Sequence, residues 1–170
     1  IGPESSKPLF MECLKVITES GGNCILNYLP DGTDRFGHGK DTLEMADYKQ
    51  LNFAPQKYLK GLVDDMDHYL YIISENDPNA LKGIDPAKTM MRQKAFKPFM
   101  EWRSEKENQG KLSWTLCLYP TEAMAKEAGL SLSEFWDQVK AACFLEEKDP
   151  IKKWRETFKK INSVRDKLNK

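Results

Sequence analysis

Uncharged apolar runs mark three segments of the chain as strands. The longest run covers residues 112–119, and Pro120 ends it. A continuous apolar run of this length is typical of a strand that is buried on both faces, as in a parallel sheet. Two shorter runs, residues 24–29 and 69–73, are followed by turn-forming residues and are also predicted to be strands.

Around these runs, apolar residues recur every three or four positions, which predicts amphipathic helices. The predicted helices cover residues 9–17, 43–66, 85–102, 132–143 and 151–168. Pro55 predicts a break in the second of them. Pro98 lacks an N–H group and clashes with the preceding turn, so it predicts a kink or a break in the third.

Capping residues indicate where these helices begin and end. Ser131 is followed three positions later by Glu134, which predicts a capping box at a helix start. The other signals are Gly21–Gly22 at the end of the first helix, Thr121 before a short helix that ends at Gly129, and Asp85–Pro86 and Asp149–Pro150 at two helix starts.

Strands that alternate with helices predict an α/β fold with a small, mainly parallel sheet flanked by helices. A chain of 170 residues is about the size of one domain and long enough to bury a core without staples. We therefore expect residues 1–170 to form a single domain. Three strands are few for a parallel sheet, so a further strand is expected.

The charge balance gives no general attraction to nucleic acid or to an anionic membrane. Lys and Arg together number 26, as do Asp and Glu, and no apolar run approaches the length of a membrane span. None of the four cysteines forms a CxxC pair, and all lie within apolar patterns. We expect reduced, mostly buried thiols in a cytoplasmic protein, at Cys13, Cys24, Cys117 and Cys143.

The glycine-rich loop at residues 31–41 follows a predicted strand, so it is a candidate phosphate cradle. Its Gly32 and Gly37 have the spacing of a P-loop, but His38 stands where the lysine is required. Asp31 and Asp34 would also repel an anion. We predict a mobile loop that binds no nucleotide.

Two other groups of polar residues could have a functional or a purely structural role. Asp64, Asp65, Asp67 and His68 fit no spacing of metal ligands, so they are interpreted as a polar turn between a helix and a strand. The helix at 85–102 is basic, with Arg92, Lys94 and Lys97, followed by Arg103. Either this is a solvated face or it is a wall that faces peptide carboxylates or another domain. No catalytic, cofactor-binding or metal-ligating residue is assigned.

Short words distributed over residues 83–155 resemble, in their order and spacing, a known enzyme family. This is the aminopeptidase S/aminopeptidase T family of dinuclear metallo-exopeptidases, the thermophilic leucine aminopeptidase type. The words are Gly83-Ile84-Asp85-Pro86, Arg92-Gln93-Lys94-Ala95, Pro98, Tyr119-Pro120-Thr121, Ala123, Ala125, Ala128-Gly129, Ser131, Glu134, Ala142-Cys143, Leu145, Asp149-Pro150 and Trp154-Arg155.

The resemblance implies that the chain is the N-terminal domain of a metal-dependent aminopeptidase. In that family the metal ligands and the catalytic carboxylate lie in a C-terminal domain outside residues 1–170. The whole enzyme would use two divalent ions, zinc, cobalt or magnesium, to polarise the scissile carbonyl and activate water. Its partners would be its own catalytic domain, peptide substrates and, in a homodimer, a second copy.

The resemblance also implies a helix and a first strand ahead of Ile1, and a helix at 150–170 that leads to the catalytic domain. The chain alone is then expected to be inactive. The alternative is a stand-alone α/β ligand-binding or interaction module without catalysis. The length of the parent reading frame distinguishes the two.

Overall fold

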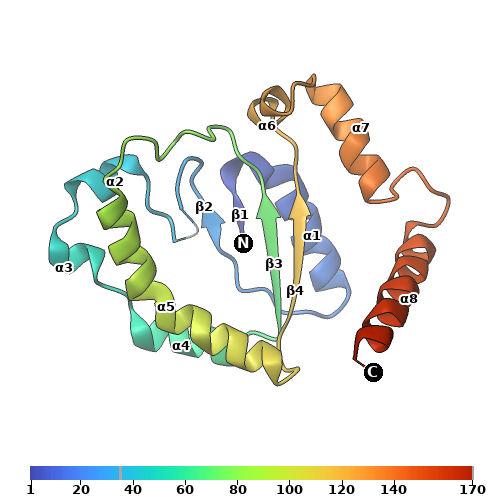
Figure 1. Ribbon diagram of the computed structural model, residues 1–170, viewed down its shortest axis with the longest axis horizontal. Coiled ribbons are helices and arrows are strands. Elements are labelled where there is room, and N and C mark those ends of the chain that lie inside the picture. The colour runs from blue at the N-terminus through green and yellow to red at the C-terminus, as the bar shows by residue number, and fades with distance from the viewer. Residues whose placement is uncertain (35, 170) are drawn as a thin grey trace. The chain divides into compact units, whose positions relative to one another are not determined.

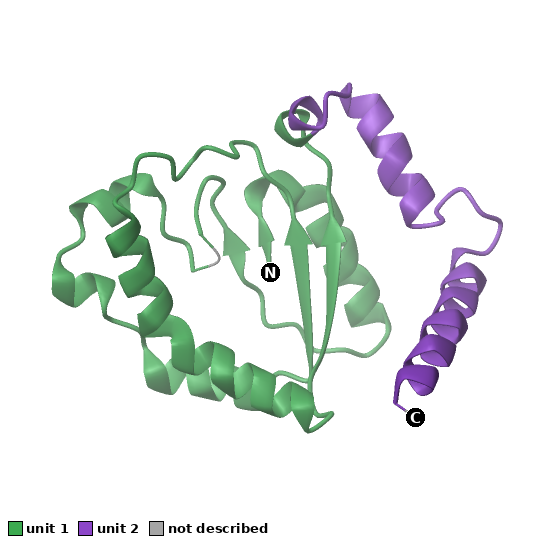
Figure 2. Ribbon diagram, viewed as in Figure 1, with its two compact units in different colours: residues 1–124 green, residues 125–170 purple. Residues whose placement is uncertain are grey.

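The computed structural model describes residues 1–34 and 36–169 and confirms the α/β class (Figure 1). The chain divides into two compact units, Ile1–Met124 and Ala125–Lys170 (Figure 2). Its elements are β1 (Gly2–Pro3), η1 (Glu4–Ser6), α1 (Lys7–Glu19), β2 (Tyr28–Leu29), α2 (Lys40–Met45), α3 (Tyr48–Leu51), α4 (Gln56–Asp65), β3 (His68–Ile73), α5 (Pro86–Asn108), β4 (Ser113–Leu118), α6 (Glu122–Glu127), α7 (Leu132–Ala142) and α8 (Pro150–Leu168).

Both strand pairs among the described residues are parallel. β3 pairs with β4 along their full lengths, and β1 pairs with β2. Ile1 joins the two pairs, because its amino group donates to Leu70 O at 2.7 Å and its carbonyl accepts from Ile72 N at 2.9 Å. The strands therefore lie in the order β2, β1, β3, β4 (Figure 1).

The strand predictions need two corrections at the start of the chain. Of the predicted strand 24–29, only Tyr28 and Leu29 form a strand, β2. The pattern gave no sign of β1, because a strand of Gly2 and Pro3 has no apolar alternation to recognise. A strand ahead of Ile1 remains a prediction.

The prediction that the strand near Leu112 is buried on both faces is wrong. β4 pairs with β3 along one edge, and no described strand pairs with the other. Its side chains Trp114 and Leu116 are 55% and 52% exposed. An apolar run reports what a strand could bury, but the neighbours in the sheet decide what is covered.

Two apolar clusters form the core of the first unit. The larger joins α4 to α5 through Leu59, Val63, Phe96 and Phe99. The smaller contains Leu43, Leu51 and Ile84. Both clusters unite residues that lie far apart in the sequence.

The predicted helix at 43–66 is three helices. The break at Pro55 is confirmed, and a second break lies at Ala46, whose backbone is extended. Asp47 starts α3 with a capping box to Gln50, with both hydrogen bonds at 2.8 Å. The competing start signal at Asp47 thus divides a continuous apolar pattern.

α5 is longer than predicted and is not broken at Pro98. A single helix runs from Pro86 to Asn108 with Pro98 inside it, and it changes direction along its length in Figure 1. The aromatic side chains that flank the proline, Phe96 and Phe99, are buried against α4. Packing on both sides of Pro98 stabilises the helix against the missing hydrogen bond.

The predicted helix starts are confirmed. Ser131 and Glu134 make the capping box of α7. The Asp85 side chain accepts a hydrogen bond from Ala87 N, and the Asp149 side chain accepts one from Lys152 N, each at 2.9 Å. Thr121 accepts from Met124 N at 3.2 Å at the start of α6.

The cysteines differ from the prediction in their burial. All four are free thiols, but each is half-buried. Cys13 illustrates the reason, since no residue of its helix α1 is buried. No helix of the described residues has both the length and the apolar character needed to cross a bilayer.

Candidate functional site

The loop at residues 31–41 folds around the carboxylate of Asp34. Asp34 Oδ1 accepts from the backbone N–H groups of Phe36 and His38, each at 2.9 Å. A phosphate cradle needs such N–H groups to be free, and here an aspartate already occupies them. Lys40 begins α2 and pairs with Glu44. The Phe36 and His38 N–H groups are therefore not free to bind an anion. That the loop is mobile and binds no nucleotide remains a prediction, and residue 35 lies outside the described residues.

The two histidines lie in separate hydrogen-bond networks. His38 contacts Asp34 and Arg92. His68, at the start of β3, contacts the hydroxyl groups of Ser113 and Thr115 on the neighbouring strand, at 2.6 and 3.1 Å. The structure therefore does not bring the histidines together in one cluster.

The acidic residues around 64–67 form the polar turn that was predicted. Asp64 and Asp65 end α4, and Asp64 pairs with Lys60 one turn earlier. The last carbonyls of α4 and the turn accept from Lys106 Nζ, at 2.9 Å for Val63 and 2.7 Å for Met66. A lysine at this helix end compensates its free carbonyl groups.

Arg92 is the most buried charged residue of the described chain, with 6% of its surface exposed. Its Nη1 donates to the backbone oxygens of Gln50 and Phe53, at 3.2 and 2.7 Å. Its Nη2 lies 2.9 Å from His38 Nε2, and its guanidinium stacks over the Phe96 ring at 4.6 Å. Arg92 thus fixes the loop of His38 and the end of α3 to α5.

The contacts of His38 define its tautomer. A guanidinium has no acceptor, so His38 Nε2 must accept from Arg92. The other nitrogen, Nδ1, lies 3.3 Å from Asp34 Oδ1 and donates to it. The imidazole is therefore neutral and carries its hydrogen on Nδ1. Burial lowers the pKa of the Arg92 guanidinium, and the charge of Asp34 acts in the opposite direction.

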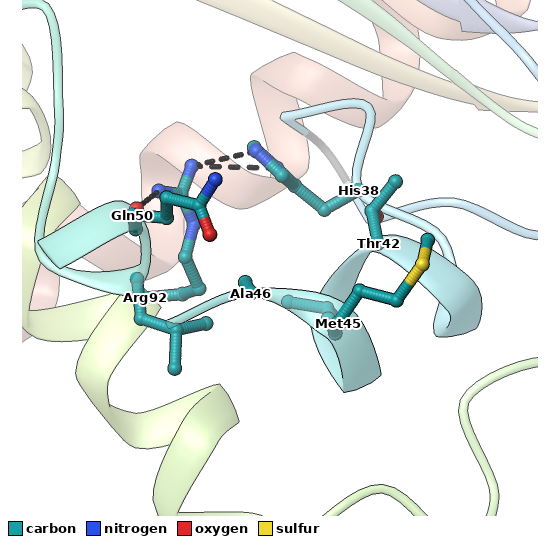
Figure 3. A pocket seen from close by; sticks show the side chains of 8 residues that line it. His38, Thr42, Met45, Ala46, Gln50 and Arg92 are labelled. Carbon is teal, nitrogen blue, oxygen red and sulfur yellow. Dashed lines mark hydrogen bonds between the residues drawn. The ribbon is translucent and has the colours of Figure 1, made fainter. Parts of the chain in front are cut away.

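Two cavities meet at this network. The larger has a volume of about 1210 Å³ and lies among α1, α4, α5 and β3. Its wall is mainly apolar, with Phe10, Ile17, Tyr58, Leu62, Phe96 and Phe99. The smaller, of about 310 Å³, lies beside α2 and α3 (Figure 3). His38, Gln50 and Arg92 line both, so these three residues form the candidate site.

The sequence analysis named Arg92 as one of several basic residues of a helix and as part of a family word, and it named His38 as a departure from a P-loop, but it assigned neither to a site. A signal for Arg92 was present, because Arg92, Phe96 and Phe99 share one helical face at intervals of four and three. An arginine on the apolar face of a helix indicates a buried cation. No local pattern links it to His38, 54 positions earlier.

The polar residues after the strands form a second group. Asp31, after β2, accepts from Ser5 N at 2.9 Å and from Asn76 Nδ2 at 2.7 Å. Thr121, after β4, donates to the backbone oxygen of Glu75, which follows β3. These polar groups satisfy one another's hydrogen-bonding capacity, and they hold the carboxyl ends of β2, β3 and β4 together.

The described residues do not fit the two divalent ions that the resemblance implies. Such ions need several converging oxygen or nitrogen ligands. Within residues 1–34 and 36–169, no three His, Cys, Asp or Glu side chains are grouped so that they could hold an ion.

Comparison with known proteins identifies what this chain is similar to. Aminopeptidase PepS of Streptococcus thermophilus is 24% identical over 104 residues, which is 57% of this chain and 25% of the relative. The solved structure of wild-type AmpT from Thermus thermophilus has the same fold, with a TM-score of 0.65 at 21% identity. That match covers 91% of this chain and 38% of AmpT.

The chain therefore spans about a quarter to two fifths of the length of these relatives. A comparison with protein families matches residues 14–170 to the thermophilic metalloproteases (M29). This agrees with the resemblance found in the words of residues 83–155. Because the match includes nearly the whole sequence, the chain belongs to the thermophilic metalloprotease (M29) family.

Proposed function

We propose that the chain is the N-terminal, non-catalytic part of a metal-dependent aminopeptidase, and that its first unit forms a wall of the substrate chamber. Membership of a metalloprotease family over residues 14–170, together with the lack of grouped metal ligands in the described residues, carries this proposal. The metal site would then lie in sequence outside residues 1–170.

Several features of the first unit support a role as a wall. The apolar cavity of about 1210 Å³ is large enough for several amino-acid side chains. Arg92 and His38 add a fixed polar group at its edge, which would orient a peptide. A cytoplasmic location, a homodimer and a contact between this chain and its own catalytic domain belong to the same proposal.

A stand-alone ligand-binding module is the second candidate, and the smaller cavity, of about 310 Å³, favours it. Pockets of about 300–1,000 Å³ with apolar walls and a few polar groups are typical ligand sites. The two candidates differ in one respect. The first needs a catalytic partner, whereas the second needs none.

Release of a chromogenic anilide from a leucyl substrate tests the proposal. We expect the purified chain to release none when zinc, cobalt or magnesium is added, and the product of the full parent reading frame to release it in a chelator-sensitive way. Chelator-sensitive turnover that co-purifies with residues 1–170 would overturn the proposal. So would a parent reading frame that stops after Lys170.

A further inference from the structure

Among the described residues, no carboxylate forms an ion pair with Arg92, and the charge of Asp34 acts on it only from a distance. All of its hydrogen-bond partners among the described residues are neutral: two backbone carbonyls and the imidazole of His38. Its Nε is covered and makes no hydrogen bond. Burying an unpaired cation is costly, and a protein normally compensates it with an anion or with hydrogen bonds. The site is therefore complementary to an anionic group.

A donor remains for such a group. Nη2 carries two hydrogens and lies 2.9 Å from His38 Nε2 and 3.3 Å from His38 Nδ1. Because Nδ1 donates its hydrogen to Asp34, only Nε2 can accept from Nη2. The second hydrogen of Nη2 has no partner among the described residues. Arginine binds carboxylates well because its planar donors match carboxylate oxygens.

The smaller cavity gives this donor a specific apolar neighbourhood. The Arg92 guanidinium lies across it from the side chains of Thr42 and Met45 (Figure 3). Leu43, Ala46 and Leu51 supply the rest of its apolar wall. A volume of about 310 Å³ suits an amino acid or the last residue of a short peptide.

The carboxylate of Asp34 disfavours a ligand with more than one negative charge. Asp34 lies behind His38, with Oδ1 already accepting from Phe36 N, His38 N and the His38 ring. The Asp34 carboxylate would weaken the attraction of Arg92 for an anion and would repel a doubly charged phosphate. A monocarboxylate with an apolar side chain meets both requirements.

We propose that the pocket formed by His38, Thr42, Met45, Ala46, Gln50 and Arg92 binds the carboxylate of an amino acid or of a short peptide with an apolar C-terminal side chain. The carboxylate accepts from Arg92 Nη2, and the side chain packs against Met45 and Ala46. The choice of peptides as the ligand class rests on the proposed function. The carboxylate and the apolar side chain follow from the pocket itself.

Titration of the full chain with N-acetyl-leucine and N-acetyl-leucinamide, followed by NMR or calorimetry, tests the proposal. These compounds differ only in the carboxylate, and we expect the amide to bind at least about tenfold more weakly. Leucine and the dipeptide Leu-Leu distinguish a free amino acid from a peptide end. Inorganic phosphate should not compete. Equal binding of the acid and the amide, or no binding of any of the four compounds, would overturn it.

Variants locate the binding in the pocket. Arg92→Met should abolish the preference for the acid. Because Arg92 also fixes α3, Met45→Ala provides a second variant: Met45 is 77% exposed, so its loss should leave the fold intact and weaken binding about fivefold. Met90, 55% exposed on α5 and outside the pocket, gives the matched control Met90→Ala. Equal effects of the two methionine variants would contradict the proposal. The assay measures binding without hydrolysis, so its failure is separate from failure of the anilide assay.

Discussion

The two units of the chain carry equally clear helical patterns but use them differently. In the first unit, apolar stripes meet in a core in which Val63 and Ile72 are 1% and 0% exposed. In the second unit, no residue of α7 or α8 is buried. The stripe of α8 stays largely open, with Phe158 at 54% and Val164 at 56%. An amphipathic stripe thus predicts a helix without predicting what covers it.

The contacts that define each unit also differ in range. α7 and α8 begin with hydrogen bonds between residues three positions apart, as between Ser131 and Glu134. In the first unit, Arg92 and Lys106 donate to carbonyls about 40 positions away. We therefore expect the first unit to depend on long-range packing and the second on local capping.

The largest expected difference in the free energy of unfolding is between a buried side chain of the sheet and an exposed side chain at its open edge. Ile72→Ala should lower the free energy of unfolding by about 3 kcal/mol, because it leaves a cavity beneath a fully buried side chain. Leu116→Ala on β4, where the side chain is 52% exposed, is the matched control and should cost less than about 1 kcal/mol. Urea denaturation measures both. Equal losses would mean that β4 is covered in solution.

An intermediate effect is expected from the cap of α7. Ser131→Ala removes the acceptor for Glu134 N and should destabilise the helix by about 1 kcal/mol. Amide hydrogen exchange in α7 should then become about fivefold faster, while exchange in β3 stays unchanged. Ser133, two positions later and outside the cap, gives the control Ser133→Ala. Faster exchange in β3 as well would show that the two units unfold together.

The smallest effect is a pH dependence of the same cap. The hydrogen bonds from the Ser131 hydroxyl and backbone N–H lower the pKa of Glu134 below its ordinary value. A carboxyl whose pKa is lower in the folded state stabilises the fold above its unfolded pKa, and this contribution is lost as the pH falls through the folded value. Helicity of α7 should therefore decrease on acidification. Glu134→Gln should remove most of this dependence, and an unchanged pH profile would contradict the assignment.

Most helix starts could be predicted from the sequence because a cap is a contact between neighbours. Asp85, Ser131 and Asp149 each act within three residues of their own position. The break at Ala46 was missed because the capping box at Asp47 lay inside a continuous apolar pattern. β1 was missed because two residues, Gly2 and Pro3, are too short to show a strand period.

The candidate site was largely beyond reach of the sequence. Arg92 was recognised as basic, and its apolar helical face offered a signal of burial, but its acceptors lie on α3 and on the loop of His38. The role of Asp34 was anticipated only as repulsion of an anion. Its actual contacts, which fold the loop and set the tautomer of His38, depend on the geometry of that loop.

The sequence by itself determined the α/β class, the positions of the principal helices and the family to which the chain is similar, because periodicity, caps and short words are properties of neighbouring residues. The tertiary structure alone decided which apolar surfaces are covered, as the open face of β4 shows, and which polar groups meet. Burial and long-range hydrogen bonds depend on elements that are distant in sequence. The physical reason is that packing brings together residues such as His38 and Arg92, whose proximity no local pattern encodes.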